Sequence, residues 1–146
     1  MQNSQEVQSA TAALRAALEA ASGASSQPFG ARCISCGSAE KNASPIGLIL
    51  GTGLSGLADR LAERVAVPYA DLPGFSPAAV SGHEGALKIG TVHDAPVFYL
   101  KGRTHLYEGA GADPIKATIR TLKKLGVEVL VLTNACGGLH EDLNPG

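Results

Sequence analysis

Tryptophan is absent from this 146-residue chain, and aromatic residues together make up only 4% of it. Aromatic side chains are the platforms on which proteins stack single-stranded nucleic acid, so their scarcity argues against that class of function. Charge is also scarce and balanced, because charged residues are 17% of the chain and the net charge is −1. No strong field therefore attracts nucleic acid or an anionic membrane surface.

Cysteine is equally rare, with three residues in the chain. An odd and small number does not fit a secreted scaffold held by disulfides. Cys33 and Cys36 form a single C-x-x-C, and no second pair completes a tetrahedral zinc site, so we expect no metal.

No apolar run approaches the ~18 residues that span a bilayer. No basic segment precedes an apolar stretch near the N-terminus. These absences predict a cytoplasmic protein that binds neither membranes nor nucleic acid.

Apolar residues make up 45% of the chain, enough for the buried core of one domain. Residues 5–21 have helical spacing and are followed by Gly23, a residue typical of helix ends. Serine, glycine and proline are frequent over residues 22–44, which indicates a linker. We therefore divide the chain into an N-terminal helix with its linker, residues 1–44, and a domain over residues 45–146.

The rest of the chain alternates between strand and helix patterns. Short apolar runs predict buried strands, and amphipathic spacing predicts the helices between them. We expect strands over residues 46–50, 86–92, 96–101 and 127–133, and helices over residues 54–64 and 113–125. This order predicts an α/β fold, a layered mixed β-sheet flanked by helices.

A glycine-rich loop, Gly51-Thr52-Gly53-Leu54-Ser55-Gly56, follows the first predicted strand. Its backbone N–H groups can approach an anion, the following helix adds partial positive charge, and Thr52 can donate its hydroxyl. The pattern G-x-G-x-x-G also fits a dinucleotide site, with Asp71 twenty residues after Gly51. Pro68 weakens the strand that such a fold requires between them. The loop alone fits an anion site, a dinucleotide site or a plain tight turn.

Two further loops follow predicted strands. Residues 102–109, Gly-Arg-Thr-His-Leu-Tyr-Glu-Gly, place Arg103 and His105 on one face of an extended chain. Arginine offers a planar fork to an oxyanion, histidine offers a hydrogen bond or a proton, and Glu108 can orient the imidazole. Residues 133–138, Thr-Asn-Ala-Cys-Gly-Gly, are small enough to let the backbone approach a ligand. Ligands of open α/β sheets lie beyond the carboxyl ends of strands, so we expect one pocket shared by these loops.

Together with Gly82-His83-Glu84-Gly85, these motifs resemble in order and spacing those of the purine nucleoside phosphorylases, in particular the trimeric class that prefers inosine and guanosine. The resemblance covers residues 45–146, and several ordered motifs are far more specific than one glycine loop. It implies reversible phosphorolysis of purine ribo- and deoxyribonucleosides to the free base and (deoxy)ribose 1-phosphate, a pentosyl transfer of purine salvage. Inorganic phosphate is then a substrate, and no cofactor is needed.

The resemblance also implies roles for the matching residues. The residues that match the phosphate site are Thr52, His83, Arg103, His105 and, through its backbone N–H, Ala135. Tyr107 matches a ribose contact, and His105 and Glu108 are the residues expected to take part in catalysis. The partners implied are a purine nucleoside, phosphate and further copies of the chain, arranged as a homotrimer.

Members of that family continue well beyond Gly146, and the residues that hold the purine base lie in that further part. We therefore expect a chain that is incomplete at its C-terminus, with a phosphate site and part of a ribose site, and inactive alone. Two alternatives remain, a non-catalytic anion-binding fragment and a nicotinamide-dependent oxidoreductase of the Rossmann type. A short-chain reductase needs Tyr-x-x-x-Lys, and none of Tyr69, Tyr99 and Tyr107 has a lysine at that distance.

Overall fold

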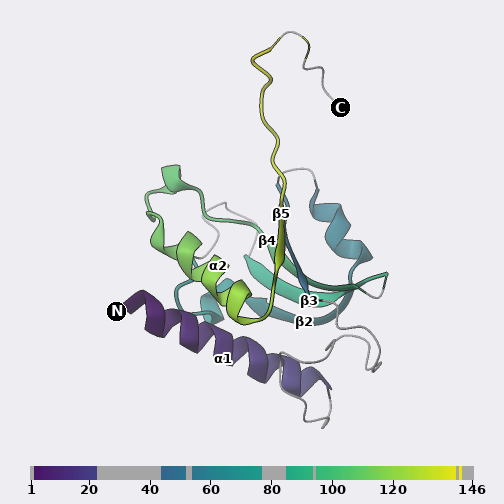
Figure 1. The fold of residues 1–146 in the computed structure, drawn as a ribbon, viewed down its shortest axis with the longest axis vertical. Coiled ribbons are helices and arrows are strands. Elements are labelled where there is room, and N and C mark those ends of the chain that lie inside the picture. The colour runs from purple at the N-terminus through teal and green to yellow at the C-terminus, as the bar shows by residue number, and fades with distance from the viewer. Residues whose placement is uncertain are drawn as a thin grey trace.

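The computed structural model describes residues 2–22, 44–51, 54–76, 85–93, 95–140 and 142 of the chain. The two longer helices are α1 (Gln2–Ser22) and α2 (Asp113–Lys124). The strands are β1 (Ile46–Ile49), β2 (Ala62–Pro68), β3 (Ala86–Val92), β4 (Ala95–Lys101) and β5 (Val129–Leu132), and short 3-10 helices are η1 (Ser55–Arg60), η2 (Tyr69–Asp71) and η3 (Leu106–Glu108). Figure 1 shows these elements along the chain.

The strands form one five-stranded mixed sheet in the order β2-β3-β4-β1-β5. β2, β3 and β4 are antiparallel neighbours, whereas β1 runs parallel to both β4 and β5. The carboxyl ends of β4, β1 and β5 therefore lie side by side at one edge of the sheet. The loops that follow these three strands all begin at that edge, which is the usual place for ligands in α/β sheets.

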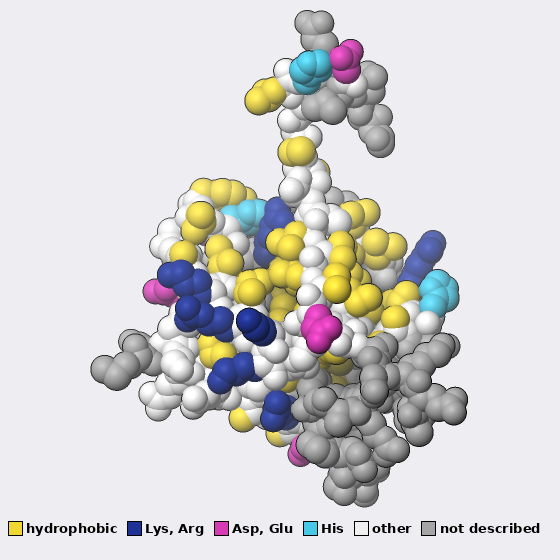
Figure 2. Space-filling model, viewed as in Figure 1, with side chains coloured by type: hydrophobic (Ala, Val, Ile, Leu, Met, Phe, Trp, Pro, Cys, Tyr) yellow, Lys and Arg dark blue, Asp and Glu magenta, His cyan; other side chains and the backbone are white. Residues whose placement is uncertain are grey.

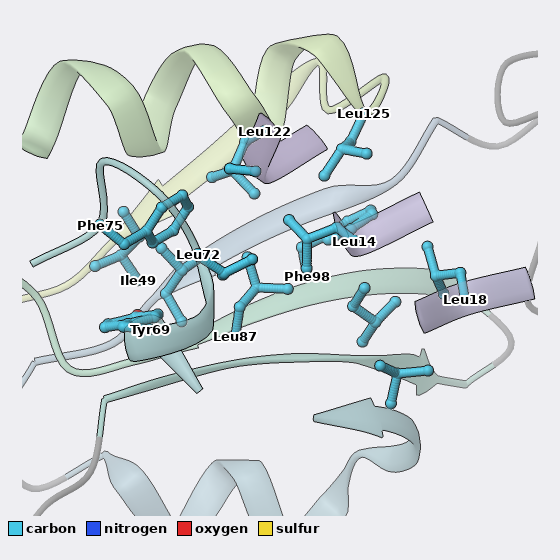
Figure 3. Close-up of a cluster of buried hydrophobic side chains, with 14 residues drawn as sticks. Leu14, Leu18, Ile49, Tyr69, Leu72, Phe75, Leu87, Phe98, Leu122 and Leu125 are labelled. Atoms are coloured by element: carbon cyan, nitrogen blue, oxygen red, sulfur yellow. The ribbon is translucent and has the colours of Figure 1, made fainter. Parts of the chain in front are cut away.

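The main hydrophobic core lies between one face of the sheet and the two long helices (Figure 3). Leu14 and Leu18 of α1 and Leu122 of α2 belong to the same buried cluster as Leu87 and Phe98 of the sheet. Each of these side chains is at most 3% exposed. Burial of a side chain of this kind contributes about 1.5–3 kcal/mol, so α1 is an integral part of the packed core.

The other face of the sheet carries a second, smaller cluster. Alternation along β4 directs Phe98 and Leu100 into the main core and Val97 and Tyr99 to the opposite face. There Val97 and Tyr99 pack with Leu61, which follows η1. The expected layered sheet with flanking helices is confirmed by this arrangement.

The predicted strands and the helices over residues 5–21 and 113–125 are confirmed as β1, β3, β4, β5, α1 and α2. The helix predicted over residues 54–64 is confirmed only in part, because Ser55–Arg60 form the 3-10 helix η1 and β2 begins at Ala62. Val65 lies buried in β2, whose backbone pairs with β3. These tertiary contacts outweigh the helical spacing of the local sequence. Pro68 is tolerated because it ends an edge strand, where its missing N–H is not required.

The expected linker over residues 22–44 lies, apart from its two ends, outside the described residues, as do Cys33 and Cys36. Within the described ranges, neither helix combines the length and the apolar character that crossing a membrane requires.

Candidate functional site

The loops after β1 and β5 are joined by hydrogen bonds at Thr133. Its backbone N–H donates to the Ile49 carbonyl oxygen over 3.1 Å, which extends the parallel ladder by one residue. Its Oγ1 accepts a hydrogen bond from the Gly51 N–H over 3.0 Å. Thr133 therefore fixes the first residue of the glycine-rich loop against the end of β5.

Gly51 is required by the close approach of these two loops. A Cβ built at this position would lie 2.7 Å from the carbonyl oxygen of Thr133 and 2.9 Å from the Cα of Asn134. Both atoms belong to the backbone, which cannot turn aside as the end of a side chain can. The glycine thus lets two main chains meet where the sequence predicts that a ligand binds.

Arg103 connects the third loop to the same point. Its Nη1 donates a hydrogen bond to the carbonyl oxygen of Thr133 over 3.1 Å, and the residue is half-buried. This is the only hydrogen bond of the Arg103 side chain to another described residue, so the remaining guanidinium donors are available to an oxyanion. The structure therefore brings Gly51, Arg103 and Thr133 together from the ends of β1, β4 and β5.

His105 and Tyr107 lie further along the same loop and stack on each other. Their ring centroids are 4.8 Å apart, with 18° between the ring planes. His105 is half-buried, whereas Tyr107 is 84% exposed, so one face of the tyrosine ring is open to a ligand or to another chain. The stack restrains the orientation of the imidazole, which lies two residues after Arg103.

Glu108 is half-buried in η3, and its backbone N–H donates to the His105 carbonyl oxygen over 3.1 Å. Its carboxylate makes no hydrogen bond to the His105 imidazole in the described part of the loop. The role of Glu108 in orienting that ring therefore stays a prediction.

Ala135 lies two residues beyond Thr133, in a segment that leaves the sheet (Figure 1). It is exposed, and its backbone N–H has no hydrogen-bond partner among the residues described. Cys136 beside it is an exposed free cysteine. The segment that carries Ala135 is therefore exposed to solvent, whereas Arg103 is half-buried.

Two predicted site residues, Thr52 and His83, lie outside the described residues. Within the described ranges, no group of three or more His, Cys, Asp or Glu side chains could hold a metal ion. The sequence placed Thr133 in the predicted ligand loop of residues 133–138 but indicated no separate role for its side chain, although a threonine directly after an apolar strand was a usable signal. At the level of sequence, Tyr69 was weighed only as a reductase tyrosine, and its contact with this site was missed: its hydroxyl donates to the Gly102 carbonyl oxygen over 2.9 Å. That contact joins residues 33 positions apart, so local spacing gives no sign of it.

A family model described as the phosphorylase superfamily matches residues 45–146. Purine nucleoside phosphorylase 1 of Geobacillus stearothermophilus is 46% identical over 101 residues, which are 69% of this chain and 37% of that protein. Purine nucleoside phosphorylase 1 of Bacillus subtilis (strain 168) is 43% identical over 101 residues, with the same coverage of 69% and 37%.

Solved structures give the same family. The crystal structure of the purine nucleoside phosphorylase from Schistosoma mansoni in complex with acetate superposes with a TM-score of 0.73 at 31% identity. The match covers 97% of this chain and 44% of that one. A purine nucleoside phosphorylase in complex with ribose-1-phosphate gives a TM-score of 0.74 at 30% identity, over 96% of this chain and 43% of the other. The chain thus spans less than half the length of these relatives.

Proposed function

This chain belongs to the phosphorylase superfamily, among the purine nucleoside phosphorylases, and we propose that it supplies the phosphate site for reversible phosphorolysis of purine nucleosides. In that reaction an oxygen of inorganic phosphate attacks the anomeric carbon of the nucleoside. The glycosidic C–N bond breaks, and the products are the free purine and (deoxy)ribose 1-phosphate. The protein must hold a phosphate dianion beside the sugar and stabilise the charge that develops on the departing base.

The observation that carries the proposal is the junction of Arg103, Thr133 and Gly51. The guanidinium is held by one hydrogen bond to the Thr133 carbonyl oxygen, and that carbonyl belongs to the residue which also fixes Gly51. A guanidinium with further donors forms strong, paired hydrogen bonds to phosphate oxygens. An Arg103 held in this way binds an anion with less loss of side-chain freedom than an unrestrained arginine.

The other roles in this proposal follow the resemblance. Thr52, His83, His105 and the backbone N–H of Ala135 complete the phosphate site with Arg103. Tyr107, exposed beside His105, contacts the ribose. Glu108 and His105 assist the reaction, and the substrate phosphate makes a metal or organic cofactor unnecessary.

The assembly is also part of the proposal. β5 presents apolar side chains to solvent, with Val129 56%, Val131 40% and Leu132 58% exposed. Exposed apolar surface at a sheet edge favours association, and we propose a homo-oligomer, a trimer by resemblance to the family. The rarity of cysteine supports a reducing compartment, the cytoplasm.

The alternative of a nicotinamide-dependent oxidoreductase is not favoured, because the family model and the solved structures matched are phosphorylases. The alternative of an anion-binding fragment shares the phosphate site and differs in catalysis. Residues that hold the base are expected outside the matched residues 45–146, so we expect the 146-residue chain to bind phosphate without useful turnover.

Binding of inorganic phosphate to the purified chain tests the proposed site. Titration calorimetry of the wild-type chain, Arg103→Ala and the control Arg120→Ala separates the site from a loss of charge alone. Arg120 lies on α2, where it donates to the Asn3 side chain. We expect Arg103→Ala to weaken phosphate binding by about 1.5–3 kcal/mol, the size of a hydrogen bond to a charged group. Equal losses in the two variants would reject the assignment.

An inosine assay with phosphate tests catalysis. Lost help to the leaving group typically lowers a rate by ~10²–10⁴-fold, and lost positioning of the substrate lowers it further. We therefore expect the chain to fall at least that far below the Geobacillus stearothermophilus relative under equal conditions. Turnover within about tenfold of that relative would place a base site inside residues 1–146.

A further inference from the structure

Tyr69 is a buried residue that lies far in sequence from Arg103 and close to it in space. It begins η2 directly after β2 and is 4% exposed. Its ring lies against Phe75 in the main core, with the centroids 5.4 Å apart (Figure 3). None of the motifs of the sequence analysis includes it.

The backbone and ring of Tyr69 are fixed at Gly85. The Tyr69 N–H donates to the Gly85 carbonyl oxygen over 2.8 Å. A Cβ at Gly85 would overlap the tyrosine ring, so the ring packs directly against the main chain. Tyr69 is thereby held from two sides, by Phe75 and by Gly85.

The hydroxyl of Tyr69 reaches the start of the Arg103 loop. It donates to the carbonyl oxygen of Gly102 over 2.9 Å. Gly102 has φ +86°, a left-handed conformation that glycine adopts without strain. The bonded carbonyl belongs to the peptide unit that links Gly102 to Arg103. Because a peptide unit is planar, fixing its oxygen also fixes the direction in which the chain enters Arg103.

The Tyr69 hydroxyl keeps its proton, so it can donate this hydrogen bond. Burial, with a smaller contribution from nearby Tyr99, raises the pKa of the Tyr69 hydroxyl well above its usual value. The hydroxyl therefore remains a neutral donor at any pH at which a phosphate enzyme works.

We propose that Tyr69 is a positioning residue, which holds the Gly102 carbonyl so that Arg103 reaches the carbonyl of Thr133 and presents its free donors to an anion. The contacts run from the core to the site through Tyr69, Gly102, Arg103 and Thr133. The nature of the anion, inorganic phosphate, rests on the proposed function. The positioning of the Arg103 side chain does not.

Tyr69→Phe tests this inference, because it keeps the ring between Phe75 and Gly85 and removes only the hydroxyl. Ile89→Val is the matched control, since Ile89 is a 7% exposed member of the same core and its truncation costs a similar amount of stability. In each variant, NMR measures the side-chain Nε–H signal of Arg103 and the hydrogen exchange of the amides of residues 103–108. Calorimetry measures the affinity for inorganic phosphate.

In Tyr69→Phe we expect the Arg103 Nε–H signal to shift and the amides of residues 103–108 to exchange faster than in Ile89→Val. Phosphate affinity should fall by about three- to tenfold, as the loss of one hydrogen bond allows. An unchanged Arg103 signal, or faster exchange spread evenly over the chain as in the control, would overturn the inference. A shifted Arg103 signal with phosphate binding that neither Tyr69→Phe nor Arg103→Ala alters would support the positioning and reject phosphate as the ligand.

Discussion

The two margins of the sheet differ in how completely this chain covers them. At the β2 margin, the inward-facing side chains of Val65 in β2 and Tyr69 in η2 belong to the main core and are 9% and 4% exposed, although the outward-facing residues of β2 are exposed. At the β5 margin, Val129 and Leu132 are 56% and 58% exposed. Figure 2 shows hydrophobic side chains gathered on this side of the molecule. The chain thus buries the apolar side chains at the β2 margin in its own core and leaves those of β5 exposed.

The candidate site crosses the boundary between these two regions. Arg103 follows β4 and is held, through Gly102, by Tyr69, which lies directly after β2. Ala135 follows β5 and is exposed, without a partner in the described part of the chain. Arg103 is therefore held by contacts within this chain, whereas Ala135 is exposed and has no such contact in the described residues.

The largest expected effect contrasts the buried core with the exposed β5 margin. Leu87 in β3 is 0% exposed, and Val131 in β5 is 40% exposed. Leu87→Ala leaves a cavity in the main core and should cost about 2–5 kcal/mol of the free energy of unfolding. Val131→Ala removes partly solvated methyl groups and should change it by no more than about 0.5 kcal/mol. Urea denaturation measures both, and similar losses would mean that β5 is as well packed as β3.

A second prediction concerns the junction where the two regions meet. Gly51→Ala places a methyl group against the backbone of Thr133 and Asn134, which must move apart. We expect a loss of about 1–3 kcal/mol of stability, typical of forced overpacking, together with weaker phosphate binding. Thermal unfolding and phosphate titration measure the two effects.

Gly56→Ala is the matched control for that substitution, because a Cβ at Gly56 meets nothing within 4 Å. Removing a flexible glycine there should leave stability unchanged or raise it by up to about 1 kcal/mol. The close approach of the two loops would be disproved if both alanine variants behaved alike.

The third prediction tests the open margin as a contact surface. At micromolar concentration we expect the chain to self-associate, and Val131→Lys should weaken that association by about tenfold, since an edge charge opposes pairing. Ala12→Lys adds the same charge at an exposed position on α1 and should have little effect. Sedimentation velocity over a concentration series gives the result. A stable monomer for the wild-type chain would contradict the predicted self-association through β5.

The smallest expected effect lies in the buried interior, on α2. Thr121 on α2 is 0% exposed, and within the described structure its Oγ1 has no hydrogen-bond partner. Thr121→Val keeps the shape and removes the unpaired hydroxyl, so stability should rise by up to about 1 kcal/mol. Thr118→Val one turn away loses a 2.9 Å hydrogen bond to the Pro114 carbonyl oxygen and should lower stability slightly. A destabilised Thr121→Val in chemical denaturation would show that the hydroxyl is satisfied.

Local sequence predicted most of the sheet, because an apolar run such as Val129–Leu132 predicts a strand whatever its neighbours in the fold are. It failed between residues 54 and 68. There Leu54, Leu57 and Leu61 follow helical spacing, yet Leu61 is buried against Val97 and Tyr99 while the two others are exposed. Pairing of β2 with β3 decided that segment, and such pairing joins residues that spacing along the chain cannot relate.

The sequence by itself determined β1, β3, β4 and β5, the loops that follow them and the residue types suited to phosphate, since these depend on short patterns and on the chemistry of each side chain. Only the tertiary structure decided that Gly51, Arg103 and Thr133 meet, because parallel pairing of β1 with β4 and β5 brings together ends that lie 30 or more residues apart. It also decided that Tyr69 supports Arg103, since a buried hydroxyl must find a partner wherever the fold offers one.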